Sequence, residues 1–198
     1  EMETAIMIQE SGVEASDFIG GQTHGDELYT NFTAFLNGKK VDLTAMSFGN
    51  IDKLEFMQSS DLFAPTGLSY VGTKVGTSAK RWSFNKNGYH RLTSKLTWLY
   101  AVDLKYNYMF MIPIFRNFGG VNITNKFLVS DNYTVKDISI ANHVNNTPYV
   151  GLAFGGALRM WGDSGISLDF NISKGLDAKS MFYVSNSASP AYNKAYYS

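Results

Sequence analysis

The sequence contains no cysteine, which excludes disulfide bonds and thiolate metal sites. It also lacks any run approaching ~18 consecutive apolar residues, so no transmembrane helix is expected. A closed β-barrel is still compatible with the sequence, because such a barrel crosses a bilayer with strands. Charged residues make up 17% of the chain, below the about 25% of ordinary soluble domains. Because the formal net charge is +0, we expect no nucleic-acid partner.

Catalytic motifs are equally scarce. Neither H-E-x-x-H nor G-x-S-x-G occurs, and the three histidines, His24, His90 and His143, are too scattered for a metal-ligand spacing. We therefore expect a protein without enzymatic activity, bound cofactor or metal ion.

Basic residues are missing from the first part of the chain. There is no Lys or Arg from Glu1 to Gly38, whereas acidic residues recur there. This asymmetry predicts that residues 1–28 form a distinct segment, and its apolar run "TAIMIQ" predicts one strand. Two interpretations of the segment are open: a first strand followed by a loop, or an acidic arm that adds as a strand to a neighbouring chain.

The remainder, residues 29–198, shows the pattern of one all-β domain. Asn37-Gly38 and Asn87-Gly88 each separate β-prone segments, the strongest short-range signal for a β-hairpin. We find no convincing helix pattern and no internal repeat. The predicted class is all-β with antiparallel strands.

The longest period-two pattern runs from Leu92 to Ile114. Its even-numbered residues are apolar or aromatic except Ser94, and no Gly, Asn or Pro between Thr97 and Tyr106 marks a turn. We therefore predict one long or bent strand. A strand of this length, ~75 Å at about 3.3 Å per residue, is typical of a barrel that spans an outer membrane, with the even-numbered side chains facing lipid.

A second alternating region lies near the C-terminus. Residues 150–160 and 166–172 present apolar side chains on one face and small or polar ones on the other, separated by "WGDSG". With the long run, this pattern over residues 29–198 resembles small bacterial outer-membrane β-barrel proteins of the OmpA/OmpW-like kind. The resemblance implies an antiparallel up-and-down β-barrel of roughly 8–10 strands, in contact with membrane lipids or lipopolysaccharide, with a structural, narrow-pore or surface-recognition role.

Alternation does not reveal which face is outside. The same pattern fits a soluble extracellular β-sandwich or calycin-like domain, secreted or at the cell surface, whose apolar face points to a core. Such a domain would bind an apolar ligand, a sugar or a partner protein.

Five charged residues are the candidate polar network of the barrel interior: Lys95, Asp103, Lys105, Arg159 and Asp169. Inside a narrow barrel, opposite charges are expected to pair and fill the lumen. The alternative is that these residues line a narrow path for a solute.

Three further residues are candidates for recognition: Tyr133, His143 and Tyr149. They lie in or beside segments rich in Asn, Ser and Tyr, which supply hydrogen bonds and aromatic surface with little charge. The expected partner of these loops is a host surface or another protein.

Overall fold

A computed structural model describes residues 3–20, 26–45, 49–115, 117–124, 126–129, 135–137, 147–150, 157–165, 167–171, 181–185 and 192–197. The elements found in these residues are strands and turns, which confirms the predicted all-β class for this part of the chain. The strands form sheets of six, two, four and five strands, and none of these sheets closes into a barrel within the described residues.

The described residues contain no helix that is long and apolar enough to cross a membrane.

The chain divides into two compact units. The N-terminal unit is Ile6–Tyr106, and the C-terminal unit combines Glu1–Ala5 with Asn107–Ser198. The division falls inside strand β1 (Glu3–Glu10) and strand β8 (Asp103–Phe115), so each of these strands contributes residues to both units.

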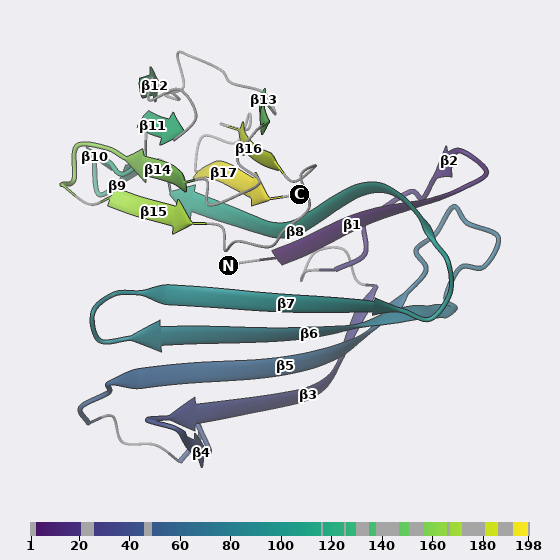
Figure 1. Ribbon diagram of the computed structural model, residues 1–198, viewed down its shortest axis with the longest axis horizontal. Helices are drawn as coiled ribbons and strands as arrows, with labels where there is room; N and C mark the ends of the chain where they lie inside the picture. Colours follow the sequence, from purple (N-terminus) through teal and green to yellow (C-terminus); the bar gives the residue numbers. More distant parts are fainter. Residues whose placement is uncertain are drawn as a thin grey trace. The chain divides into compact units, whose positions relative to one another are not determined.

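A five-stranded sheet in the order β4-β3-β5-β6-β7 dominates the N-terminal unit in its described residues. Figure 1 shows β3, β5, β6 and β7 as long neighbouring ribbons, with β4 beside the end of β3. The strands of this unit outside β1 and β8 are β2 (Val13–Glu14), β3 (Glu27–Leu36), β4 (Lys39–Val41), β5 (Lys53–Phe63), β6 (Lys74–Asn85) and β7 (His90–Trp98).

Both predicted hairpins are confirmed in this sheet. Asn37 and Gly38 connect β3 to β4 with φ angles of 50° and 82°, the positive values that a two-residue type I′ turn requires. The second turn, with φ of 76° at Gly88, connects β6 to β7, which pair antiparallel from Phe84 opposite His90 to Gly76 opposite Trp98.

Cross-strand pairing gives this sheet two distinct faces. Residues directly opposite each other share a face, and side chains alternate along each strand. The registers align even-numbered residues of β5, β6 and β7 with one another and with Phe32, Ala34 and Leu36 of β3. We call this side the even face and the opposite side the odd face.

The C-terminal unit contains shorter strands. In the described residues β13, β16, β17, β8 and β1 are neighbours in that order, and β1 continues into the N-terminal unit, where it pairs with β2. A second sheet has the order β12-β11-β14-β15, and β9 pairs with β10. The bounds are β9 (Asn117–Phe118), β10 (Val121–Asn122), β11 (Lys126–Val129), β12 (Val135–Asp137), β13 (Thr147–Val150), β14 (Ala157–Trp161), β15 (Ser167–Asn171), β16 (Met181–Ser185) and β17 (Tyr192–Tyr197).

The predicted single strand from Leu92 to Ile114 is wrong. β7 ends at Trp98 and β8 begins at Asp103, and the intervening residues 99–102 are not in a strand. The two strands join different sheets, since β7 pairs with β6 whereas β8 pairs with β17. The break needs no Gly or Pro because tertiary packing supplies it: Val102 and Trp98 both pack against the same buried cluster.

That cluster is the hydrophobic core of the N-terminal unit. β1 contributes Ile6 and Ile8, and the segment after β2 contributes Ile19; all three are completely buried. They pack with Leu62 of β5 and Val75 of β6. The predicted strand at "TAIMIQ" is thus confirmed as β1, while strand addition of this segment to a neighbouring chain stays a prediction.

Glycine at position 76 leaves room for the Trp98 ring, which belongs to the residue directly opposite on β7. A Cβ atom there would be 2.8 Å from the carbonyl oxygen of Thr97 and 3.1 Å from the Trp98 ring. The first distance is too short for a Cβ atom unless the backbone of β7 moves, and the second would require the Trp98 ring to shift slightly, so packing favours glycine at this position.

A buried ion pair lies beside this core on the even face. Lys80 Nζ donates hydrogen bonds of 3.0 Å to both carboxylate oxygens of Glu27, and the two side chains are only 6% and 1% exposed. A charge removed from water is costly unless its partner remains, so each of these residues requires the other.

Replacing one member of this pair should therefore destabilise the fold. We expect Lys80→Met to lower the free energy of unfolding by about 3–5 kcal/mol, because it removes the ammonium group from a buried carboxylate. The double variant Glu27→Leu with Lys80→Met should recover part of the loss. Urea unfolding followed by tryptophan fluorescence measures both effects, and an unchanged midpoint for Lys80→Met would contradict the assignment.

Candidate functional site: the aromatic row on the even face

Four ring side chains form a continuous row across four neighbouring strands of the N-terminal unit. Phe32 of β3 stacks on Phe56 of β5, with ring centroids 5.7 Å apart and planes at 24°. Phe56 meets Phe84 of β6 edge-on at 6.0 Å, and Phe84 meets His90 of β7 edge-on at 4.8 Å. These separations lie in the range at which aromatic pairs attract each other. We call these four residues the aromatic row.

The registers explain why the row forms. Leu54, Phe84 and His90 are directly opposite one another, as are Phe56 and Trp82. The row therefore steps diagonally from β3 to β5 and from β5 to β6, a separation that large rings can bridge, and crosses directly from Phe84 to His90. Leu54, Trp82 and Leu92 lie on the same face and widen the row into an apolar surface.

This surface remains partly open to water. Phe32 is 55% exposed, although its ring is apolar, while Phe56, Trp82 and Phe84 are half-buried. A group of partly exposed aromatic side chains on a sheet is unfavourable in water and commonly marks an interaction site. The row is accordingly the best candidate for a binding surface in the described part of the chain.

Polar side chains border the apolar surface further along the strands. Gln58, Lys80 and Ser94 are in register, and Gln58 Nε2 donates a 3.1 Å hydrogen bond to Ser60 Oγ. In the described structure the buried Oγ atoms of Ser78 and Ser94 have no hydrogen-bond partner. Along the strands, the side chains of the even face thus change from aromatic to polar within the length of one strand.

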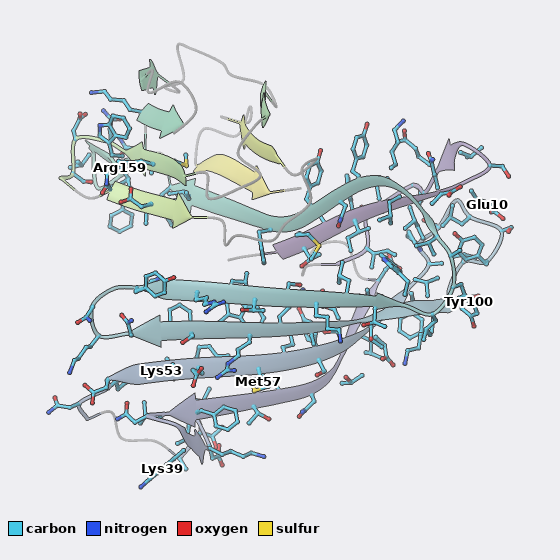
Figure 2. The ribbon with its side chains drawn as sticks, viewed as in Figure 1. Glu10, Lys39, Lys53, Met57, Tyr100 and Arg159 are labelled. Atoms are coloured by element: carbon cyan, nitrogen blue, oxygen red, sulfur yellow. The ribbon has the colours of Figure 1, made fainter. Side chains whose placement is uncertain are left out.

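The odd face is polar and carries ion pairs. Glu55 accepts hydrogen bonds from Arg81 Nη2 at 2.6 Å and Nε at 3.1 Å, and Lys53 Nζ lies 2.9 Å from the same carboxylate. Hydrogen bonding by Lys53, and secondarily by Arg81, lowers the pKa of Glu55 despite the opposing effect of burial. Figure 2 labels Lys53 and Met57, which lie on this face of β5.

Two of the residues predicted for a lumen network form an ion pair in the C-terminal unit. Arg159 of β14 is opposite Asp169 of β15 and donates from Nε to Oδ1 at 2.6 Å and from Nη2 to Oδ2 at 2.7 Å. The hydrogen bonds with Arg159 lower the pKa of Asp169, and those with Asp169 raise the pKa of Arg159. The predicted hairpin around "WGDSG" is confirmed by this pairing. Figure 2 labels Arg159 on its strand.

The other three members of that set lie in the N-terminal unit. Lys105 Nζ is 3.4 Å from Glu14 Oε1 and 5.8 Å from the centre of the Tyr106 ring. Asp103 is at the start of β8, where its charge contributes, after burial and Glu10, to raising the pKa of Tyr70. Lys95 is exposed on the odd face of β7. Their role inside a barrel stays a prediction.

Two of the three residues predicted for recognition are not among the residues that the structure describes. Tyr133 and His143 lie outside the described residues, and Tyr149 lies in β13, opposite Phe182. Recognition by these loops stays a prediction.

In the described part of the chain, no group of three His, Asp or Glu side chains is arranged to hold a metal ion.

Comparisons of the chain with protein-family models, with curated proteins and with solved structures found no match. Its function is therefore inferred from its own residues.

The aromatic row was not predicted from the sequence, although a local signal for part of it exists. The turn at Asn87-Gly88 pairs β6 with β7 and places Phe84 opposite His90. Phe32 and Phe56, by contrast, meet through the pairing of β3 with β5, which no turn motif between them announces.

The lowered pKa of Glu55 predicts acid sensitivity of the sheet. A carboxyl group whose pKa is lower in the folded state stabilises the fold above its ordinary pKa of 4.5, and this contribution is lost as the pH falls through the lowered value. Glu55→Gln should therefore be less stable than the wild type at pH 7, and the difference should shrink towards pH 3.

Urea midpoints measured across this pH range test the effect. Asp52→Asn is the matched control, because the ion pair of Asp52 with Lys86 is exposed on both sides and contributes little. A stability difference between wild type and Glu55→Gln that stays constant with pH would contradict the role of the Glu55 carboxylate.

Proposed function

We propose that this chain is a non-enzymatic binding module, secreted or displayed at a cell surface, and that the aromatic row binds an apolar ligand. The observation that carries the proposal is the row itself. Its rings connect four strands with centroid separations of 5.7, 6.0 and 4.8 Å, and Phe32 at its end is 55% exposed. Burial of the exposed half of this side chain by a ligand would contribute about 1–1.5 kcal/mol, because burying an entire side chain of this kind is worth about 1.5–3 kcal/mol.

The geometry of the row supports an elongated or flat ligand. Four neighbouring strands at about 4.8 Å spacing give an aromatic surface roughly 14 Å long that crosses the strands. Leu54, Trp82 and Leu92 border it with further apolar contact. The polar side chains of Gln58 and Ser94 limit the apolar surface in the direction of the core.

Binding of the apolar fluorophore N-phenyl-1-naphthylamine tests this function. We expect its fluorescence to rise on binding to the wild type, and Phe32→Ser to raise the dissociation constant about tenfold because an exposed ring contact is lost. Phe32 is suitable because its exposure allows substitution without opening the core.

Val71→Ser is the matched control. Val71 is similarly exposed, at 53%, but belongs to the turn before β6 and is not part of the aromatic row. Wild-type binding by Val71→Ser together with weakened binding by Phe32→Ser supports the proposal. Failure of the wild type to bind the fluorophore, or equal weakening by both variants, refutes it.

An outer-membrane β-barrel is the second candidate function, and strand length favours it. β5, β6 and β8 contain 11, 12 and 13 residues, enough to cross the hydrocarbon layer, which needs about 9–11 tilted residues. In such a barrel of a bacterial outer membrane the even face would contact lipid or lipopolysaccharide. Lys95, on the odd face, would belong to the interior network.

Electrophoresis distinguishes the two candidates. A membrane barrel is extracted only with detergent and migrates differently before and after heating, because the closed sheet resists unfolding in detergent. A binding module is soluble without detergent, and its migration does not depend on heating. We expect the second result.

A further inference from the structure

The outer edge of β7 is the longest regular edge of the five-stranded sheet. β7 pairs with β6 through nine consecutive residues without any register shift, and no strand pairs with its other side in the described residues. The opposite edge of the sheet is interrupted, because β4 pairs with one end of β3 and an irregularity separates Tyr29 from Asn31. Proline, a common protection of edge strands, is missing from β7.

Two hydrogen bonds show which backbone groups of β7 point outward. Asn85 N donates to Tyr89 O at 3.1 Å at one end of the hairpin, and Leu99 N donates to Val75 O at 2.9 Å at the other. Antiparallel ladders alternate bonded and non-bonded pairs, so the odd-numbered residues between these points bond to β6. The N–H and C=O groups of the even-numbered residues therefore point away from β6. Ser94 is the middle one of these residues along β7.

We propose that β7 pairs antiparallel with β7 of a second copy of this chain, with the two Ser94 residues opposite each other. Each Ser94 N–H then donates to the Ser94 carbonyl of the other copy, and the two side chains lie on the same face. The five-stranded sheets of the two copies become one continuous sheet. This pairing does not depend on the proposed ligand.

The sequence of β7 is complementary to itself in this register. Leu92 lies opposite Leu96 of the second copy, and His90 lies opposite Trp98. On the odd face, Lys95 and Arg91 lie opposite Thr93 and Thr97, so no two like charges are directly opposed. The two Lys95 residues are diagonal neighbours, and their repulsion weakens the pairing.

Sedimentation velocity at increasing protein concentration tests the pairing. We expect a reversible monomer–dimer equilibrium in the wild type. Ser94→Pro should raise the dissociation constant of the dimer about tenfold or more, because it removes the two central hydrogen bonds. The substituted N–H points away from β6, so proline is tolerated there and the monomer should keep its tryptophan fluorescence. Ser94→Ala, which keeps the N–H group, should weaken the dimer less.

Lys95→Thr supplies a test in the opposite direction. Removing the diagonal repulsion should tighten the dimer severalfold, and added salt should tighten the wild-type dimer by screening the same charges but leave Lys95→Thr nearly unchanged. A wild type that stays monomeric at all concentrations, or a dimer that neither Ser94→Pro nor Lys95→Thr alters, would overturn the proposal.

Discussion

The antiparallel hydrogen-bond ladder of β3, β5, β6 and β7 is the constraint on which the candidate site depends. A ladder permits only one alternation of side chains and one alternation of bonded backbone pairs. The first places Phe32, Phe56, Phe84 and His90 on one face, within ring contact of each other. The second directs the backbone groups of Ser94 away from β6. A shift of one residue between β6 and β7 would disrupt both arrangements.

The two faces of this sheet meet different requirements. The odd face carries cross-strand ion pairs such as Glu55 with Arg81, in which a buried carboxylate is bonded to an exposed guanidinium group. The even face carries the core at one end and the aromatic row at the other, with the buried Lys80–Glu27 pair between them. Because that pair is almost inaccessible to water, it separates a closed apolar region from an open one. The open region is the one able to meet another molecule.

Local patterns predicted a large part of the fold. The turns at Asn37-Gly38 and Asn87-Gly88 and the alternation in residues 157–171 correspond to hairpins, because a β-turn and its flanking strands are determined within about a dozen residues. The candidate site could not be predicted from local patterns to the same extent. The charged residues chosen from the sequence are divided between two units, and the aromatic row depends on pairs such as Phe32 with Phe56, which are far apart in the chain.

By itself, the sequence determined the all-β class, the hairpin turns and the two-sided character of β7, since each follows from residue types within a short window. Tertiary structure decided where the run from Leu92 to Ile114 is divided, because residues 99–102 contain no turn signal and β7 and β8 leave them for different sheets. It also decided that Lys80 finds Glu27, 53 positions earlier in the chain. Strand pairing over such separations depends on the summed burial of entire sheets, which no local pattern encodes.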